Sequence, residues 1–379
     1  MIDLATLFVR REIPLDRPEH RTTETSGCPD HFASRGEKGA EMLHLSNHHQ
    51  LHLGLCYLLN VYYFLKPAIP QTVRFALRHS YALPLKWAFA GSWPIRPASC
   101  VVPRGWPGWP NGKSFAFVLT HDVEGNVGLA RCRQLAELEM RLGFRSSFNF
   151  VPEGEYATPR TVRSFLEDRG FEVGVHDLRH DGKLYTSYKT FKDRARRINH
   201  YLKSWNAVGF RSGFMRHNLQ WLQDLNIQYD ASTFEHDPFE PQPDGMHTIF
   251  PFWVRRDDGS TYVELPYTLA QDSTLFLVLR ETTNDVWKRK LDWIAAHGGM
   301  ALVIVHPDYM AFDDPKGSSE YRAELYQNFL EYVRERYGDV AWFARPRDVA
   351  DYVRQHHVAA SPAMPEAASA RRGEFERSA

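Results

Sequence analysis

The chain has 379 residues, enough for one large domain with a satellite or for two ordinary domains. Hydrophobic residues make up 43% and charged residues 24%, close to the averages for soluble globular proteins. Lysine plus arginine and aspartate plus glutamate both number 46, so there is no global positive field and we expect no nucleic-acid partner.

The first 110 residues differ from the rest. Residues 1–45 are irregular and charged, whereas 46–110 are helical in character and end in a segment dense in proline, glycine and tryptophan. That segment predicts a rigid linker or a lid over the next domain. The apolar stretch 51–65 is about 15 residues long, too short to span a bilayer, so a core or interfacial helix is expected.

The compartment is predicted from the N-terminus and the cysteines. Near the N-terminus, Asp3 is acidic where a signal peptide needs basic residues, and no apolar run with a cleavage site follows. The four cysteines are scattered without a C-x-x-C pair, which fits a reducing environment. We therefore expect a cytoplasmic protein.

Strand and helix patterns alternate from about residue 111 onward. Strands are predicted at 115–119, 146–151, 171–175, 207–210, 227–230, 301–305 and 340–343. Helices are predicted at 127–142, 161–169, 187–205, 217–225, 284–297, 319–337 and 346–355. Residues 235–282 are irregular, with β-like pieces at 248–254 and 261–265.

These repeats define the expected fold. About seven β-α units predict a parallel sheet or an incomplete barrel. The fold class is thus α/β, an irregular or incomplete (β/α)7 barrel with a mostly helical N-terminal extension. The predicted catalytic domain covers 111–358, and the tail 359–379, rich in Ala, Pro, Glu, Arg and Ser, is expected to be disordered.

Acidic residues follow the first predicted strand. Its apolar run leads into Asp122 and Glu124 at the carboxyl end, where α/β proteins place ligand crevices. The two residues are two apart, so in extended backbone both carboxylates project to the same side. Like charges there repel unless a cation or a shared proton lies between them. A metal-assisted site is the first hypothesis, and two solvated acids are the alternative.

Two histidines follow the third predicted strand. His176 and His180 are four residues apart and would share one face of a helical turn, where both rings can reach one cation. Zinc-like metals accept imidazole nitrogen and carboxylate oxygen together. A lone H-x-x-x-H pair is usually structural. This pair, however, follows its strand as Asp122 and Glu124 follow theirs, and parallel neighbours bring strand ends together.

Other strand ends repeat the pattern. Arg211 follows the fourth strand, Asp230 closes a short strand and His306 ends the β-branched run 303–305. Each has a plainer interpretation, as a surface ion pair, a turn former and a hydrogen-bonded loop residue respectively. Their shared place at the carboxyl face of the strands favours a joint functional site.

In order, these motifs resemble one family. Thr120-His121-Asp122-Val123-Glu124, His176-x3-His180, Arg211-Ser212-Gly213-Phe214 and Val303-Ile304-Val305-His306-Pro307 are similar to the polysaccharide deacetylase pattern (NodB homology, carbohydrate esterase family 4). The likeness is nearest to divergent members that read H-D-V-[D/E] and are found with surface-polysaccharide genes. It covers residues 113–350 and does not explain the first 90 residues.

The resemblance implies a role for each matching position. It implies that Asp122 is the catalytic base and that Arg211 holds its carboxylate, and it makes His306 the general acid. It implies a divalent metal, which we expect to be zinc, bound by Glu124, His176 and His180. It also implies that the backbone N–H of Phe214 faces the oxyanion.

The sequence also departs from the family. Val123 replaces the metal-binding Asp of the commoner T-F-D-D-G version, so the ligand role moves to Glu124, which is one methylene longer. The arginine motif lacks the usual Pro-Tyr. For the family's Asp-Trp motif the only candidate is Asp230, expected as a partner of Arg211 or His306.

The implied reaction removes acetyl from an N-acetylated sugar or glycan in surface-polysaccharide or O-antigen synthesis. Aromatic residues in the irregular region, Tyr267 among them, could stack on sugar rings or simply pack, and Gln271-Asp272 are candidates to line the groove. The basic helix 189–203 either meets an anionic glycan or lipid carrier or is a solvated face. A lipid-linked substrate would bring peripheral membrane contact.

Two alternatives stay open. One keeps the site but changes the substrate to a small cyclic amide or another non-peptide C–N bond. The other is a catalytically degenerate carbohydrate-binding or scaffolding protein that retains the fold.

Overall fold

The computed structural model describes residues 70–240, 242 and 244–356. All described residues belong to one compact unit of the chain. The predicted irregular segment 1–45, the apolar stretch 51–65 and the tail 359–379 lie outside the described residues. No helix in the described part is long and apolar enough to cross a membrane.

A nine-stranded sheet forms the centre of the described part, in the order β11-β1-β2-β3-β4-β5-β7-β6, with β8 beside β1. Neighbouring strands are parallel except β6 and β7. The strands are β1 (Phe115–Val123), β2 (Ser147–Phe150), β3 (Glu172–His176), β4 (Gly209–Arg211), β5 (Tyr229–Asp230), β6 (Phe252–Arg255), β7 (Thr261–Glu264), β8 (Met300–Val305) and β11 (Ala341–Ala344). Strands β9 (Met310–Ala311) and β10 (Tyr321–Arg322) pair separately.

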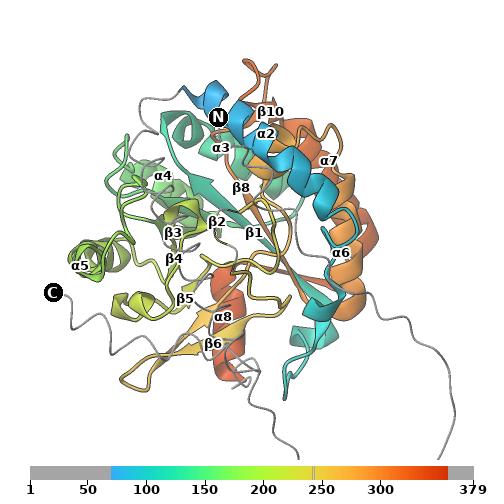
Figure 1. Ribbon diagram of the computed structural model, residues 1–379. Coiled ribbons are helices and arrows are strands. Elements are labelled where there is room, and N and C mark those ends of the chain that lie inside the picture. Colours follow the sequence, from blue (N-terminus) through green and yellow to red (C-terminus); the bar gives the residue numbers. More distant parts are fainter. Residues whose placement is uncertain (1–69, 241, 243, 357–379) are drawn as a thin grey trace, which may run out of the picture. The chain divides into compact units, whose positions relative to one another are not determined.

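Helices lie around this sheet (Figure 1). They are α2 (Gln71–Ala88), α3 (Asn126–Arg141), α4 (Arg160–Glu167), α5 (Tyr188–Ser204), α6 (Asp285–His297), α7 (Ala323–Tyr337) and α8 (Pro346–Gln355). Short 3-10 turns are η3 (Pro97–Cys100), η4 (Pro110–Gly112), η5 (Gly213–Met215) and η6 (Trp221–Asp224), and η7 (Ser273–Val278) is a π-helix.

The alternation of side chains along β1 creates two cores. Ala116 and Val118 join the interior cluster, which α8 covers with Val349 and Val353, whereas Phe117 packs under the outer helices. All nine residues of β1 are buried, as expected of a strand covered on both faces.

The curled sheet closes without a regular strand at one position. The backbone N–H groups of Thr268 and Leu269 both donate to the Leu302 carbonyl of β8, at 3.1 Å each. An irregular segment after β7 therefore takes the place of a strand pairing. The predicted fold class, an α/β incomplete barrel, is confirmed.

The helix predicted at 217–225 is wrong, because only the 3-10 turn η6 forms there. The side-chain oxygen of Asn218 accepts hydrogen bonds from the backbone of Gln220 and Trp221, and such bonds compete with helix formation. Leu219, Leu222 and Leu225 recur every third residue, which suits a 3-10 turn better than an α-helix.

The segments before β1 pack on the same unit. Helix α2 contacts η7, where His79 Nδ1 donates to the Val278 carbonyl at 2.7 Å. Trp109 donates to the Gly298 carbonyl at 2.7 Å and packs on Trp342 and Tyr352. Because Gly298 and Trp342 lie at the amino ends of β8 and β11, the Pro/Trp-rich segment plugs the end of the sheet opposite the predicted site. The choice between a rigid linker and a lid over this domain stays a prediction.

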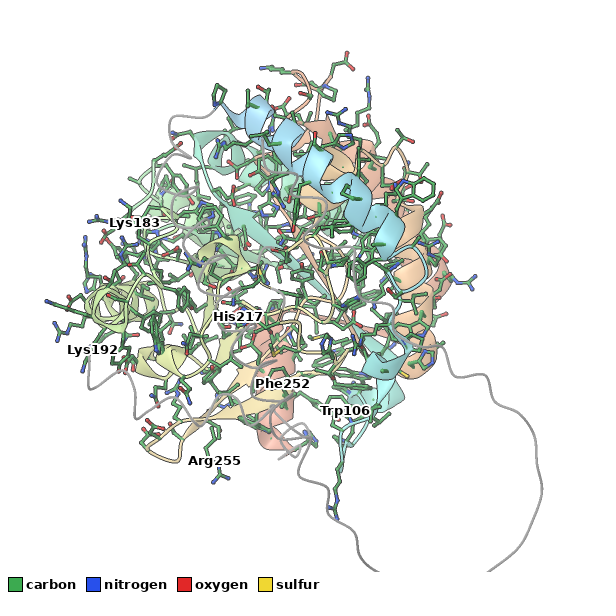
Figure 2. All side chains as sticks on the ribbon, viewed as in Figure 1. Trp106, Lys183, Lys192, His217, Phe252 and Arg255 are labelled. Carbon is green, nitrogen blue, oxygen red and sulfur yellow. The ribbon has the colours of Figure 1, made fainter. Side chains whose placement is uncertain are left out.

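The basic helix α5 is a solvated face with ion pairs. Lys192 points away from the sheet (Figure 2) and is exposed. Arg194 makes a two-pronged contact with Asp181, at 2.7 and 2.8 Å. These observations favour the plainer of the two interpretations of this helix.

Candidate active site

The interior face of β1 becomes polar toward its carboxyl end. After Ala116 and Val118, the same face carries Thr120 and Asp122. On β2, Asn149 lies beside Asp122 and donates to its Oδ1 at 2.9 Å. On β3, Gly174 is opposite Asn149, and a Cβ there would lie 2.2 Å from Asn149 Oδ1. A glycine is thus needed for Asn149 to reach Asp122.

The side chain of Arg211, the last residue of β4, extends toward Asp122 and Thr120. Its guanidinium is fully buried; Nη1 lies 3.5 Å from each oxygen of Asp122 and donates to Thr120 Oγ1 at 2.9 Å. Burial alone would raise the pKa of Asp122, but Arg211, His176 and His306 outweigh it and lower that pKa. The carboxylate is therefore ionised at neutral pH. The interpretation of Arg211 as a surface ion pair is wrong.

The two histidines do not share a helical turn. His176 is the last residue of β3, and His180 follows in a loop where Asp177 and His180 have φ of +54° and +52°. The loop nevertheless brings the two rings to 4.9 Å. Gly213 allows this, since a Cβ there would lie 2.9 Å from the His180 ring. The shared helical turn expected for this pair is wrong, but the two rings do lie close together.

Glu124, His176 and His180 offer ligand atoms within 4.8 Å of one another. His176 Nδ1 donates to the Arg211 carbonyl at 3.1 Å, which leaves the Nε2 lone pair available when the ring is neutral. Burial, the largest cause, lowers the pKa of His176 and favours that neutral form. His180 Nε2 lies 3.1 Å from Glu124 Oε1.

The chemistry of this set fits a zinc-like ion. His176 Nε2 is buried and makes no hydrogen bond with a described residue, and His180 Nε2 lies 3.1 Å from the Glu124 carboxylate. Buried polar nitrogens without a hydrogen bond are costly unless another partner binds them. Two imidazoles and one carboxylate are a ligand set that zinc accepts while keeping a position open.

His306 follows β8 and faces the same region. Its Nδ1 donates to Asp272 Oδ1 at 2.6 Å, and its Nε2 lies 3.9 Å from Glu124 Oε1. Burial alone would lower the pKa of His306, but Asp272 dominates and raises it to about 10. The ring is therefore protonated at neutral pH and can donate a proton toward the site.

Sequence reasoning missed the roles of Asp272 and Asp308. Asp272 precedes η7, and its carboxylate also accepts from the His306 backbone N–H at 2.8 Å and from Tyr321 at 2.9 Å. Asp308 accepts from the backbone N–H groups of Glu124 and Gly125, at 2.8 Å each, and so joins the loops after β1 and β8. The only sequence signal for either was an acid near a strand end.

Asp230 is not the partner expected of it. Its carboxylate accepts from the backbone and hydroxyl of Ser232, at 2.9 and 2.7 Å, and is hydrogen-bonded with Glu264. Arg211 instead contacts Asp122, Thr120 and the Ala231 carbonyl. Burial raises the pKa of Asp230, which is consistent with a carboxyl pair that shares a proton.

Tyr267 and Phe214 were predicted to bind the substrate and the oxyanion, and the structure places them differently. The Tyr267 side chain is 2% exposed, and its hydroxyl contacts Asp237 and Glu240 at 2.9 Å each, so its ring offers no face to a sugar. The prediction that it binds substrate is corrected. Phe214 has φ of +60°, and its ring centroid lies 4.3 Å from that of His180, so its ring packs against a predicted metal ligand.

Comparisons with known proteins give only fold-level likenesses. No family model matches the sequence, and no curated protein matches it. A solved structure from Mycobacterium smegmatis, provisionally named a polysaccharide deacetylase, is similar at 18% identity and a TM-score of 0.53, over 70% of this chain and 99% of that one. Puue allantoinase is similar at 15% identity and a TM-score of 0.52, over 67% and 95%.

A third solved structure is more distant. The peptidoglycan deacetylase PdaC from Bacillus subtilis matches at 11% identity and a TM-score of 0.38, over 66% of this chain and 95% of that one. Identities this low show the fold alone. The chain therefore has the incomplete-barrel fold found in a provisionally named polysaccharide deacetylase and in an allantoinase.

Proposed function

We propose that the protein is a metal-dependent hydrolase that removes acetyl from an N-acetylated sugar, as a divergent member of the polysaccharide deacetylases. The observation that carries this proposal is convergence. Glu124, His176 and His180, from two different strand ends, offer ligand atoms within 4.8 Å of one another. An ionised Asp122 and a protonated His306 lie beside them.

The metal ligands are Glu124, His176 and His180, and we propose zinc as the ion. A divalent ion bound there would polarise the acyl oxygen and lower the pKa of a bound water to about 7. The chain's own groups complete the reaction. Phe214, whose ring packs on that of His180, would donate its backbone N–H to the developing oxyanion, an interaction commonly worth about 3–4 kcal/mol.

Proton transfer is divided between two side chains. Asp122, kept ionised by Arg211, accepts a proton from water as the water oxygen attacks the acetyl carbon. His306 gives its Nε2 proton to the amine nitrogen as the C–N bond breaks. The products are acetate and the free sugar amine.

An alternative substrate with a non-peptide C–N bond, such as a cyclic amide, is supported by one observation. The allantoinase resembles this chain as closely in fold as the provisionally named deacetylase does, with TM-scores of 0.52 and 0.53. The same base, acid and ligands would open a ring amide. Fold likeness does not separate the two reactions, so the substrate panel below includes both classes.

A lipid-linked substrate and peripheral membrane contact are also part of the proposal. The outward face of α2 carries Leu77, Tyr81 and Trp87, which are 57, 59 and 84% exposed, and α2 has three basic residues and no acidic one. Apolar faces with tryptophan and basic residues suit membrane interfaces. Co-sedimentation with anionic vesicles should fall for Trp87→Ser; equal sedimentation of both proteins would exclude this contact.

The function is tested by metal analysis and substrate release. Purified protein should contain about one divalent ion per chain, and it should release acetate from one of a panel of N-acetyl nucleotide sugars, lipid-linked sugars and small amides. His176→Ala should lose the ion and keep its fold, as judged by circular dichroism. Unchanged metal content would remove His176 from the ligand set, and metal without turnover on any substrate would favour the binding-protein alternative.

A further inference from the structure

The carboxylate of Glu124 is held by a tyrosine that the proposed reaction does not use. Tyr309 lies three residues after His306, and its hydroxyl donates to Glu124 Oε2 at 2.6 Å. The other oxygen, Oε1, is the one 3.1 Å from His180 Nε2. The two carboxylate oxygens therefore face different partners, one a hydrogen-bond donor and one the histidine cluster.

A glutamate ligand needs such support more than an aspartate does. It has one more rotatable bond, and fixing a glutamate side chain costs conformational entropy. Here both ends of the residue are held from the loop after β8. Asp308 accepts from the Glu124 backbone N–H at 2.8 Å, and Tyr309 holds the carboxylate.

Tyr309 is itself fixed by two rings. On one side Phe75 of α2 packs edge-on, with ring centroids 5.6 Å apart at 86°. On the other side lies the His306 ring, with centroids 5.2 Å apart. Phe75 is one of the few buried residues of α2, at 8% exposure. Helix α2 precedes the β-α repeats, so the N-terminal extension reaches the predicted metal ligands through two aromatic rings.

We propose that Tyr309 is a positioning residue that orients the Glu124 carboxylate toward His176 and His180, and that Phe75 of α2 keeps Tyr309 in place. The inference rests on the proposed function, because it takes Glu124 as a metal ligand. It assigns a role to α2 that the family resemblance does not cover. Groups that hold a ligand in this way typically change metal affinity 10- to 100-fold when removed.

The test measures zinc affinity rather than turnover. Metal-free wild type and Tyr309→Phe are titrated with Zn²⁺ against a chromophoric chelator, and we expect the variant to bind about 10- to 100-fold more weakly. Tyr326→Phe is the matched control. Tyr326 donates to Glu139 at 2.6 Å, the same pair of groups at the same distance, on a glutamate outside the ligand set. Its zinc affinity should stay within about twofold of wild type.

Two further variants separate positioning from general loss of structure. Phe75→Ala removes a ring contact and leaves the hydrogen bond intact, so it should weaken zinc binding several-fold; it carries the test if Tyr309→Phe does not fold. In Glu124→Asp, whose carboxylate is one methylene further from Tyr309, adding Tyr309→Phe should cost little more.

The outcomes distinguish this inference from the proposed function. If wild type binds zinc and Tyr309→Phe binds it equally well, or is weakened no more than Tyr326→Phe, Tyr309 does not position Glu124, and the metal site stands. If wild type binds no divalent ion, the proposed function fails and the inference fails with it.

Discussion

Two buried assemblies in this molecule each join a histidine, a carboxylate and a tyrosine. One joins His306 to Asp272 at 2.6 Å, and Asp272 also accepts from Tyr321 at 2.9 Å. The other joins His121 to Glu139 at 2.7 Å, and Glu139 also accepts from Tyr326 at 2.6 Å. The hydrogen bonds are nearly the same length.

The assemblies differ in what the second ring nitrogen faces. His306 Nε2 points to Glu124, 3.9 Å away, among the residues of the proposed site. His121 lies on the opposite face of β1, against Phe148 and beneath α3 and α7, and its Nδ1 has no hydrogen-bond partner among the described residues. A histidine–carboxylate pair therefore indicates catalysis only where the free side of the ring faces other reactive groups.

The largest expected effect on hydrolysis is at Asp122. This residue follows His121 in β1 and lies on the interior face, whereas His121 lies on the outer one. Asp122→Asn should lower hydrolysis roughly 10³- to 10⁴-fold, because the proton acceptor is lost while the ligand set is intact. Acetate release and metal content are measured on the same preparation. Activity close to that of wild type would place the base elsewhere, and loss of the ion would make Asp122 a ligand.

How much the sequence revealed of this region depends on whether a residue follows a regular strand. Parallel strands place their carboxyl ends together, so Asp122, Glu124, His176, Arg211 and His306 could be predicted to meet from strand positions alone. The structure brings them together. Helix α8 was predicted at its observed bounds because Pro346 marks its first turn.

The partners of these groups could not be predicted in the same way. Asp272 lies 34 residues before His306, in an irregular segment that ends in a π-helix, so no periodicity indicates its position. Asp230 was chosen because it closes a strand, but Ser232, two residues away, offers a closer donor. Alternation along β1 places His121 on the face opposite Asp122, but the strand pattern does not indicate its partners, Glu139 on α3 and Phe148 on β2.

The two histidines can be compared directly by the same substitution. His306→Gln should lower hydrolysis about 10²-fold, since the proton donor to the leaving amine is lost. His121→Gln should leave the specific activity unchanged and reduce the free energy of unfolding by about 1–3 kcal/mol, because the buried ring that packs on Phe148 and Tyr326 is lost. Rates per folded protein and urea unfolding curves test both. Equal loss of activity in the two variants would contradict the assignment of His306 as catalytic and His121 as structural, which rests on what each ring faces.

The smallest expected effect is a change in pH dependence. Asp272 raises the pKa of His306 to about 10, so the proton donor is lost only as the pH rises through that value. Asp272→Asn removes this charge and should move the alkaline fall in rate to lower pH by about 1–3 units. Glu139→Gln, the equivalent change in the outer assembly, should leave the rate profile in place.

Stability gives an independent measurement of the same coupling. A histidine whose folded pKa is raised stabilises the protein fully below its unfolded pKa of about 6.5, and this contribution is lost as the pH rises through the folded pKa. In metal-free protein, Asp272→Asn should therefore unfold at lower urea concentration than wild type near pH 6, with a smaller difference at about pH 11. A difference that is constant across this range would show that Asp272 acts through its hydrogen bonds to the His306 backbone and to Tyr321, and not through the charge of the ring.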